Sequence, residues 1–361
     1  MVQLVLYWIL IKNGMEGGGR FLEGLEQLPI PLLAWFAEHQ REMPWRSDPT
    51  PYHVWLSEIM LQQTRVAAVR DYYRRFLETA PTIADLAALT EEALLKLWQG
   101  LGYYNRARNL QKAAKLVMAE FGGVFPQTYE GVRSLPGIGD YTAGAICAIC
   151  YGLPTPAVDG NVLRVVARVT GDDGDITLPP MKKRVTERLR AVFPQKAAGD
   201  FTQALMELGA TVCLPNGPPL CEQCPAKGFC AALDTGRTGE LPVKTPKKPR
   251  RIEERTVYLL FSQGAVALRQ RAAKGLLAGL WEYPNVRSDE ASPFEGIEFD
   301  FVATGKHIFT HIEWRMTAVT ATVPRQELPE GYVWATRTEL RERYTVPNAF
   351  DAFGWKVEEG L

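Results

Sequence analysis

Four cysteines stand close together in the sequence, and their thiolates are soft ligands for a metal. They are separated by seven, two and five residues and comprise Cys213, Cys221, Cys224 and Cys230. In a cytosolic chain, such clustering indicates metal binding rather than disulfides. The C-x2-C-x5-C spacing with a preceding cysteine favours a [4Fe–4S] cluster. A structural zinc site with the same ligands is the alternative.

The other two cysteines and two acidic residues lie beside apolar segments. Cys147 and Cys150 have the spacing of a redox pair, but their apolar run predicts small residues buried on a helix. Asp159 precedes an apolar helix, where serving as the N-cap is a common use of Asp. Glu58 belongs to V-W-L-S-E-I-M-L-Q-Q-T-R-V, residues 54–66. On a continuous helix it shares one stripe with two polar residues, Gln62 and Arg65, so a solvated face is one interpretation.

A third feature is a glycine-bearing turn that opens a helix. Residues 134–146 read S-L-P-G-I-G-D-Y-T-A-G-A-I. Gly137 and Gly139 permit close backbone approach, and the N–H groups at the start of the helix can hold a phosphate. A structural helix–turn–helix without a ligand is the alternative.

The elements that must position these residues are helical from about residue 21 to 233, where apolar residues recur at three and four positions. A Pro- and Lys-rich stretch then predicts a linker. Beyond it, short alternating β-branched runs and one helix, 336–344, predict an α+β domain. The expected domains are an N-terminal extension (1–24), a helical domain (25–236), a linker (237–251) and an α+β domain (252–361).

Composition excludes a strong global field, because 41 basic residues balance 41 acidic residues. The basic run from Lys244 to Arg255 is either a solvated linker or a phosphate contact. The apolar start of the chain is shorter than the ~20 residues that a membrane span needs. We expect Met15 to be the true start and the protein to be cytoplasmic, although a weak leader or a strand would also fit the first 14 residues.

In this order, the glycine turn, V-D-G-N-V-L-R-V (158–165) and the four cysteines resemble the helix-hairpin-helix, Gly/Pro-Asp superfamily of base-excision DNA glycosylases. The resemblance covers about residues 25–235. It implies an all-α, two-lobed fold around a cleft that admits a flipped nucleotide. The [4Fe–4S] cluster would brace a loop that contacts DNA.

Two positions distinguish the branches of that superfamily. The endonuclease III branch has a Schiff-base lysine where this chain has Tyr141, and without an amine the strand-cleaving imine cannot form. The 54–66 segment is similar to the signature of the adenine glycosylases (MutY type), as are Pro44–Arg46 and G-L-G-Y-Y-N-R-A-R-N at 100–109. The resemblance therefore implies a monofunctional enzyme that removes adenine mispaired with 8-oxoguanine or guanine in duplex DNA.

Adenine leaves only when protonated, and the sugar then gains positive charge, so the site needs one protonated and one ionised carboxyl. The resemblance makes Glu58 the general acid, with a pKa raised by burial. It makes Asp159 the ionised partner that stabilises the oxocarbenium ion, with or without a transient covalent adduct. The positioning residues would be Tyr141 and Asn161. The adenine pocket would contain Trp45, Arg46 and Glu207, although Glu207 has the alternative of a helix-face residue.

Because the adenine is undamaged, selectivity must come mainly from its partner base. The resemblance assigns DNA contacts to Gln63, Thr64, Leu101, Tyr103, Gly137 and Gly139. Tyr103 would wedge into the base stack at a cost of a few kcal/mol. A core tyrosine is the alternative, which is disfavoured because Tyr104 is available for that place.

The α+β domain resembles the Nudix-like lesion-recognition domain of adenine glycosylases, most closely at K-G-L-L-A-G-L-W-E-Y-P, residues 274–284. It lacks R-E-x-x-E-E, so pyrophosphohydrolase activity is not expected. Phe309, Thr310 and His311 occupy the place of the family's Phe-Ser-His loop that reads 8-oxoguanine. Threonine keeps the hydroxyl and adds a methyl group. A bare strand-to-turn segment is the alternative.

One departure is the spacing of the first two cysteines, which is seven residues here and usually six in the family. The insertion falls in L-P-N-G-P-P-L, residues 214–220, which can bulge outward. We expect a monomer. The runner-up function is a bifunctional glycosylase/lyase of the endonuclease III type, and a non-catalytic iron–sulfur DNA-binding or redox-sensing protein is a third hypothesis.

Overall fold

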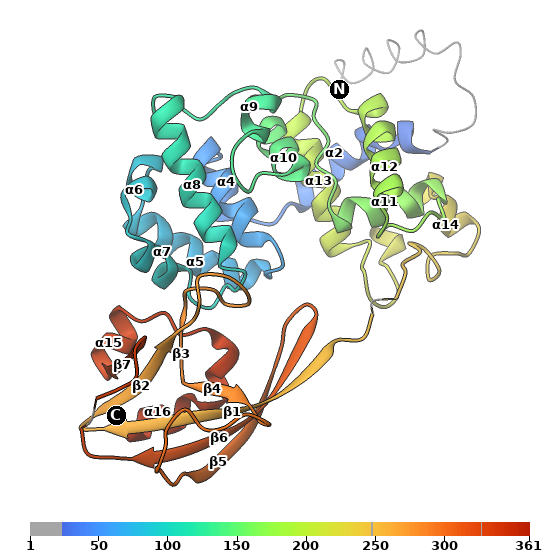
Figure 1. Cartoon of the computed structure of the whole chain (residues 1–361). Coiled ribbons are helices and arrows are strands. Elements are labelled where there is room, and N and C mark those ends of the chain that lie inside the picture. The colour runs from blue at the N-terminus through green and yellow to red at the C-terminus, as the bar shows by residue number, and fades with distance from the viewer. Residues whose placement is uncertain (1–23, 247, 326) are drawn as a thin grey trace. The chain divides into compact units, whose positions relative to one another are not determined.

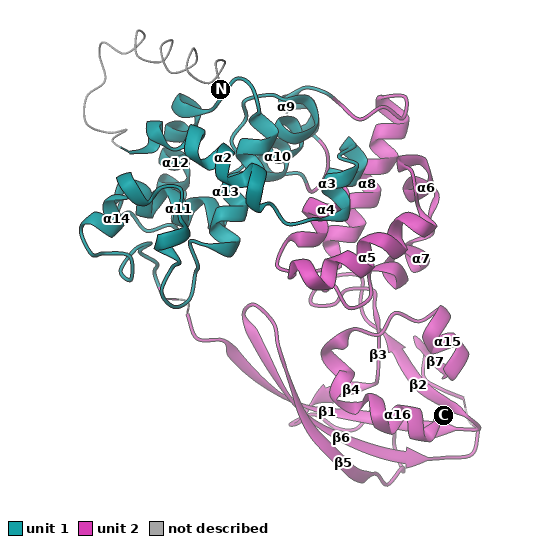
Figure 2. Cartoon of the chain, turned by 180° about the vertical axis from the view of Figure 1, so that it is seen from behind, with its two compact units in different colours: residues 1–55, 127–134, 138–245 teal, residues 56–126, 135–137, 246–361 magenta. Residues whose placement is uncertain are grey.

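The computed structural model describes residues 24–246, 248–325 and 327–361, so the predicted N-terminal extension lies outside the described residues. The chain forms two compact units that interleave in sequence (Figure 2). The first contains 1–55, 127–134 and 138–245, and the second contains 56–126, 135–137 and 246–361. In the described part of the chain, every helix is too short or too polar to cross a lipid bilayer.

The first unit is helical, as predicted. Its elements are η1 (Leu25–Gln27), α2 (Pro29–His39), α3 (Pro44–Ser47), the start of α4 (Pro51–Leu61), α9 (Tyr129–Arg133), α10 (Asp140–Tyr151), α11 (Gly160–Thr170), α12 (Pro179–Val192), α13 (Ala198–Thr211), η2 (Cys221–Gln223), η3 (Lys227–Phe229) and α14 (Ala231–Asp234). Residues 162–169 of α11 are all buried, so α11 is the central helix of this unit. The prediction for the remaining cysteines holds on α10, where Cys147 is buried and Cys150 is half-buried, both as free thiols.

Helices α11 and α13 approach each other closely because α13 carries a glycine at the contact. A Cβ atom on Gly209 would lie 2.5 Å from the Cβ atom of Asn161. Any side chain at this position would therefore push the N-terminal end of α11 away from α13. This close approach fixes the start of α11, where Asp159 stands.

The second unit combines helices with a sheet domain. Its elements after α4 are α5 (Val66–Thr79), α6 (Ile83–Ala88), α7 (Glu91–Trp98), α8 (Asn105–Glu120), β1 (Arg251–Ser262), β2 (Ala265–Gln270), β3 (Trp281–Glu282), β4 (Asn285–Arg287), β5 (Asp300–Ile308), β6 (Ile312–Thr322), β7 (Tyr332–Thr336), α15 (Arg337–Glu342), η4 (Asn348–Phe353) and α16 (Gly354–Gly360). Thr82 and Thr90 cap α6 and α7 through their side-chain oxygens.

The seven strands form one mixed sheet in the order β3-β2-β1-β6-β5, with β4 paired to β1 and β7 to β2 (Figure 1). Strands β1 and β6 run parallel from Arg251↔Ile312 to Phe261↔Thr322. Both faces of β1 are buried, since Val257 and Leu259 belong to one apolar cluster and Tyr258 and Leu260 to another. Such a strand reads as a continuous apolar run rather than a clean alternation.

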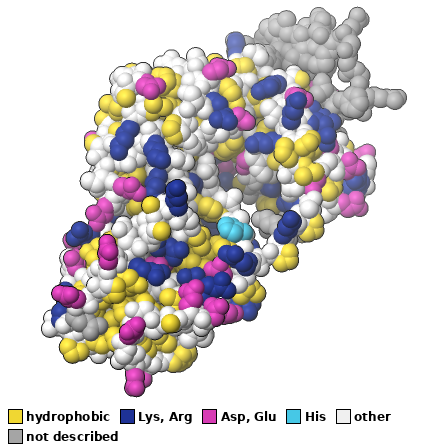
Figure 3. Space-filling view, viewed as in Figure 1, with side chains coloured by type: hydrophobic (Ala, Val, Ile, Leu, Met, Phe, Trp, Pro, Cys, Tyr) yellow, Lys and Arg dark blue, Asp and Glu magenta, His cyan; other side chains and the backbone are white. Residues whose placement is uncertain are grey.

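The runs predicted as strands correspond to β1, β2, β6 and β7, and the predicted helix corresponds to α15. The prediction missed the short strands β3 and β4, the helix α16, and β5, an edge strand whose residues are exposed or half-buried. The predicted linker ends at β1, so Arg251 and Arg255 belong to a strand and the linker interpretation is wrong for them. On the face in Figure 3, Lys and Arg side chains are mixed with Asp and Glu, in keeping with the zero net charge.

Within the second unit, the helical part holds the sheet domain through main-chain carbonyl groups. Lys96 Nζ donates to the carbonyl oxygens of Leu340 at 2.7 Å and Tyr344 at 3.2 Å. Two further donors act in the same way, Gln99 on Val346 at 2.7 Å and Arg108 on Ala278 at 2.8 Å. Burial lowers the pKa of Lys96. The carbonyl oxygens therefore replace the water that this amine loses.

Candidate active site and cluster-binding loop

Asp159 stands at the start of α11, where it is the N-cap. Its Oδ1 accepts a hydrogen bond from the Val162 N–H at 2.8 Å, and its Oδ2 accepts one from Asn161 Nδ2, also at 2.8 Å. The N-cap interpretation is therefore correct. It does not exclude a role in chemistry, because the second oxygen is held by a side chain rather than by the helix.

The pKa of Asp159 is raised, mainly because burial disfavours its charge. The hydrogen bonds from Val162 and Asn161 and the charge of Arg164 oppose this effect without cancelling it. We had expected an ionised Asp159 from the resemblance. In this structure the carboxyl is harder to ionise than an exposed aspartic acid.

Asn161 is fixed in turn by Arg164, which is 4% exposed. Arg164 Nη2 donates to Asn161 Oδ1 at 2.8 Å and to the Gly209 carbonyl at 2.6 Å, and Arg164 Nε donates to the Cys213 carbonyl at 2.7 Å. Because its oxygen is occupied by Arg164, the Asn161 amide must present its NH₂ group to Asp159. No sequence pattern points to a buried role for Arg164, since an arginine within an apolar helix run resembles a surface residue.

Glu207 on α13 is the second buried carboxyl of this unit and is only 1% exposed. Two arginines hold it: Arg41 with Nε–Oε1 at 2.5 Å and Nη2–Oε2 at 3.1 Å, and Arg46 with Nη2–Oε2 at 2.9 Å. Burial opposes the charge of Glu207, but the hydrogen bonds and charges of the two arginines outweigh it and lower its pKa. The helix-face alternative for Glu207 is therefore wrong.

The predicted adenine-pocket residues are brought together in part. Arg46 and Glu207 form an ion pair, and Trp45 lies beside Arg46 in α3 with 6% of its side chain exposed. Arg41 was missed by the sequence interpretation. Its pairing with Glu207 spans 166 residues, so no local pattern could reveal it.

Tyr141 lies on α10, and its hydroxyl group approaches the Met206 sulfur at 3.5 Å. It lines a pocket of about 650 Å³ together with the aromatic and apolar residues Tyr129 and Val158. Three basic side chains also line this pocket and were not predicted: Lys182, Lys183 and Arg190. The pocket adjoins the segment that leads to Asp159, and three acidic residues, Glu130, Asp140 and Glu187, line it together with these cations.

The four predicted cysteines line one hollow in the first unit, beside the buried side chains of α11 and α13. Burial, with a smaller contribution from the nearby Cys213, Cys221 and Cys230, raises the pKa of Cys224 to about 12. Four thiolates in this place therefore require a bound cation for their charge. Across the described residues, no group of three or more His, Cys, Asp or Glu side chains is arranged to hold a metal ion.

The insertion between the first two cysteines is accommodated on the surface. Residues 215–218 are exposed, and the Leu220 N–H closes the loop on the Val212 carbonyl at 2.9 Å. Arg168 adds a hydrogen bond from Nη1 to the Cys213 sulfur at 3.3 Å. The extra residue therefore bulges outward, as expected.

Glu58 belongs to the second unit, where it is 6% exposed on α4. The solvated-face alternative is therefore wrong. Helix α4 ends at Leu61, so Gln62 and Arg65 do not continue its stripe as the sequence suggested. The helix stops because the chain turns at Gln63, whose φ of 61° lies in the left-handed region.

Two loops of the second unit carry the remaining predicted DNA contacts. Gln63 is exposed and Thr64 half-buried in the first loop. In the second loop, Leu101 is 6% exposed and Tyr103, with a φ of 47°, is 54% exposed. The core-tyrosine alternative for Tyr103 is wrong, because Tyr104 is the buried one at 5% exposure.

The predicted lesion loop follows β5 and turns back into β6. Phe309 packs between His307 and Trp314, with ring centroids 4.6 Å and 4.9 Å apart, whereas Thr310 is exposed. The Thr310 and Tyr103 hydroxyl oxygens are 2.8 Å apart and hydrogen-bonded. Two residues predicted for the same task thus meet across 207 positions of sequence.

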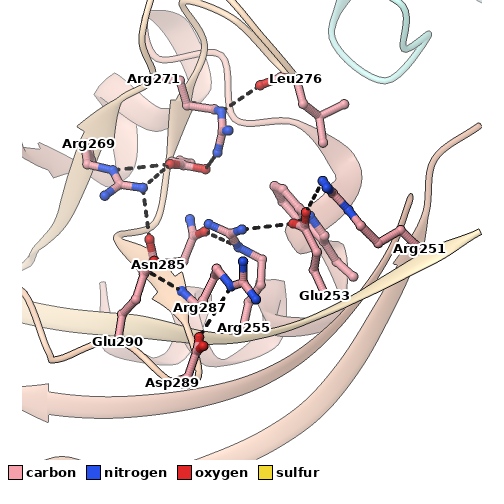
Figure 4. A network of polar contacts seen from close by, with 12 residues as sticks. Arg251, Glu253, Arg255, Arg269, Arg271, Leu276, Asn285, Arg287, Asp289 and Glu290 are labelled. Carbon is pink, nitrogen blue, oxygen red and sulfur yellow. Dashed lines mark hydrogen bonds and ion pairs between the residues drawn. The ribbon is translucent and has the colours of Figure 1, made fainter. Parts of the chain in front are cut away.

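An arginine-rich network supports this loop from below (Figure 4). Arg255 lies over the Trp314 ring at 4.6 Å and donates to Glu253 and Asn285. The indole N–H of Trp314 donates to Glu253 Oε2 at 3.0 Å. The network therefore fixes Trp314, against which Phe309 rests.

The glycine turn opens α10 as predicted. Gly137 has a φ of +78°, and a Cβ atom there would lie 2.7 Å from the Asn109 Cβ atom. Gly139 is the N-cap of α10 and is exposed. Glycine is thus required at the first position for space and for backbone conformation.

Comparison with known proteins shows the class of protein to which this chain belongs. Residues 56–195 match the HhH-GPD superfamily of base excision DNA repair proteins, and residues 256–353 match the NUDIX domain. A solved thermostable thymine-DNA glycosylase superposes with a TM-score of 0.54 at 26% identity, covering 59% of this chain and 97% of the other. An endonuclease III from a non-covalent DNA complex, 23% identical with a TM-score of 0.50, shares the fold over 58% of this chain and 97% of its own. The fold and site thus define a base-excision DNA glycosylase.

The particular family follows from the curated relatives. The adenine DNA glycosylase of Mus musculus is 34% identical over 380 residues, covering 86% of this chain and 74% of the relative. That of Homo sapiens is 35% identical over 383 residues, covering 86% and 70%. This chain belongs to the adenine DNA glycosylase family and is a DNA glycosylase of base excision repair.

Proposed function

We propose that this enzyme hydrolyses the N-glycosidic bond of adenine opposite 8-oxoguanine or guanine in duplex DNA, without cleaving the strand. The observation that carries the proposal is the half-buried pair of Asp159 and Asn161 at the start of α11. A carboxylate that is partly removed from water and oriented by an amide suits stabilisation of a sugar cation, because water disperses less of its charge.

In the proposed reaction, Glu58 donates a proton to adenine N7 as the bond between C1′ and N9 breaks. The bonding electrons leave with the neutral base. Asp159 in its ionised form stabilises the oxocarbenium ion, and a water molecule then adds to C1′ and releases a proton. Tyr141 lines the sugar side of the pocket, and Asn161 holds Asp159 in place.

Adenine recognition is assigned to Trp45, Arg46 and Glu207. The two arginines that lower the pKa of Glu207 keep it ionised, and their four hydrogen bonds occupy both of its oxygens. Glu207 would therefore act by holding Arg46 in the adenine pocket. Lesion reading is assigned to the loops that carry Gln63, Thr64, Leu101 and Tyr103 and to Phe309–His311.

The decisive experiment compares labelled duplexes that contain adenine opposite 8-oxoguanine, guanine or thymine. We expect an abasic product that breaks only after alkali, fastest with 8-oxoguanine and absent with thymine. Glu58→Gln should lose excision and keep duplex binding. Normal excision by Glu58→Gln would remove Glu58 from its proposed role.

The runner-up, a bifunctional glycosylase/lyase, is favoured by one observation, the amines of Lys182 and Lys183 in the pocket beside Tyr141. The same assay decides it. Strand cleavage without alkali, together with a borohydride-trapped adduct lost in Lys182→Ala or Lys183→Ala, would establish an imine.

We also propose that the four cysteines hold a [4Fe–4S] cluster, which would brace the loop between α13 and α14. Two observations support this proposal: the four cysteines line one hollow, and thiolates are the ligands that an iron–sulfur cluster requires. Elemental analysis should find iron and sulfide rather than zinc, in a brown protein. We further propose a cytoplasmic monomer, for which gel filtration should give a mass near 40.4 kDa.

A further inference from the structure

Arg106 on α8 contacts the end of helix α4. Its Nη1 donates to the carbonyl oxygens of Ile59 at 2.8 Å and Met60 at 3.1 Å, and also to that of Gln62. Carbonyl groups in the last turn of a helix lack intrahelical partners and carry partial negative charge. The guanidinium therefore satisfies the C-terminal end of the helix that carries Glu58.

The same side chain contacts a second segment, which follows helix α7. Its Nη2 donates to the carbonyl oxygens of Leu101 at 2.8 Å and Gly102 at 3.1 Å. The guanidinium carbon also lies 5.3 Å from the Trp98 ring centroid at the end of α7. A single planar group thus joins two chain segments that are about forty residues apart.

Both segments lead directly into a residue with strained backbone. Gln63 follows Gln62, with a φ of 61°, and Tyr103 follows Gly102, with a φ of 47°. Residues other than glycine hold such conformations only where the surroundings impose them. The carbonyl groups that Arg106 fixes precede the two strained residues, so it contributes to that constraint.

We propose that Arg106 is a positioning residue that couples the two base-reading loops, so that Gln63 and Tyr103 are presented together. This inference rests on the proposed reading of the mispair by those loops. Arg106 holds main-chain carbonyl groups and stays beneath the surface that would meet DNA. Its fork of donors is essential, because a lysine ammonium group cannot reach both sets of oxygens with fixed geometry.

The test uses the full chain and its Arg106→Lys and Arg106→Gln variants. The matched control is Arg188→Lys, which disturbs a half-buried arginine of the first unit, bound to Asp172 at 2.7 Å. Hydrogen exchange is measured for peptides covering 61–66 and 99–105. The ratio of kcat/KM for adenine opposite 8-oxoguanine to that opposite guanine is measured in parallel.

We expect faster exchange in both peptides of the Arg106 variants and a loss of at least about tenfold in the discrimination ratio. The control should change neither, even if its Tm falls equally. Faster exchange in one peptide alone, or an unchanged ratio in Arg106→Lys, would overturn the coupling. If Arg106→Gln does not fold, Arg106→Lys decides.

Failure of the proposed function has a different signature. In that case the unmodified enzyme would not excise adenine opposite 8-oxoguanine at all. The exchange measurements would still decide whether Arg106 couples the loops, because they require no substrate.

Discussion

Two carboxyls of the first unit, Glu207 and Asp159, have proton affinities shifted in opposite directions. Glu207 on α13 is surrounded by two guanidinium groups and has a lowered pKa, whereas Asp159 at the start of α11 has amide donors and a raised pKa. Burial acts in the same direction on both. The difference therefore comes from the partners: two full positive charges within hydrogen-bonding distance outweigh burial, and neutral N–H groups do not.

The contrast fits the two tasks that we propose for these carboxyls. A carboxylate that holds the arginines of a base pocket is best kept charged and immobile, and Arg41 and Arg46 keep Glu207 in that state. A carboxylate that stabilises a transient cation lowers the reaction barrier most if it has few charged partners beforehand, because its interaction energy then increases as the cation forms. Asp159 has the surroundings of the second kind.

The largest effect is expected from removing the charge at Asp159. Asp159→Asn should keep the helix-capping oxygen and lower kcat by about 10³-fold, as expected for the loss of electrostatic stabilisation of a transition state. Single-turnover kinetics would measure this. Activity within tenfold of the unmodified enzyme would show that Asp159 is only a cap.

A smaller effect, now on stability, is expected at Glu207. Glu207→Gln leaves Arg41 and Arg46 without their counter-charge and should lower the free energy of unfolding by about 3 kcal/mol. Urea denaturation would measure the change. Glu187→Gln is the control. Glu187 is 58% exposed, and its Oε1 lies 3.9 Å from Lys183 Nζ, which makes a weak ion pair. This substitution should cost less than about 0.5 kcal/mol.

Substitution of the two arginines that hold Glu207 should lower the free energy of unfolding by different amounts, because their side chains are buried to different extents. The Arg46 side chain is 14% exposed and also lies over the Phe36 ring at 5.4 Å, while that of Arg41 is 39% exposed. Arg46→Lys should therefore cost about 2 kcal/mol and Arg41→Lys about 1 kcal/mol. Equal costs in urea denaturation would mean that burial does not rank them.

The smallest effect is a pH dependence that belongs to Asp159. Its pKa in the folded state is above that in the unfolded state, so its contribution to stability is present at acid pH and is lost as the pH rises through the folded pKa. Asp159→Asn has no such group. Its stability relative to the unmodified protein should increase between pH 4 and pH 8, and a constant or falling difference would contradict the raised pKa.

Local patterns were enough to predict much of this structure. The helices, the glycine turn, the cysteine loop and most strands follow from periodicity and turn residues, and the burial of Tyr104 rather than Tyr103 followed from comparing two neighbours. The end of α4 at Leu61 could not be predicted from the sequence. The helix ends because the chain turns at Gln63 with a positive φ, and a glutamine is not typical of such a turn.

Arginines whose partners lie far away in the sequence were also missed. Arg41, Arg106 and Arg164 are ordinary arginines in sequence, and each is held by atoms tens of residues away or more. The opposite pKa shifts of Asp159 and Glu207 have the same origin. Each shift depends on which charged side chains the fold brings next to the carboxyl, and the spacing of residues within either segment does not reveal these neighbours.

The contacts of Lys96, Gln99 and Arg108 with the sheet domain have a consequence for tolerance to change. Their acceptors are peptide carbonyl oxygens at residues 278, 340, 344 and 346. Every amino acid supplies such an oxygen, so the identity of the residues on the accepting side is free to drift over generations. Substitutions that weaken this attachment should therefore be those of the three donor residues. A survey of natural variants would find stronger selection against substitutions at the three donors than at the four acceptor positions.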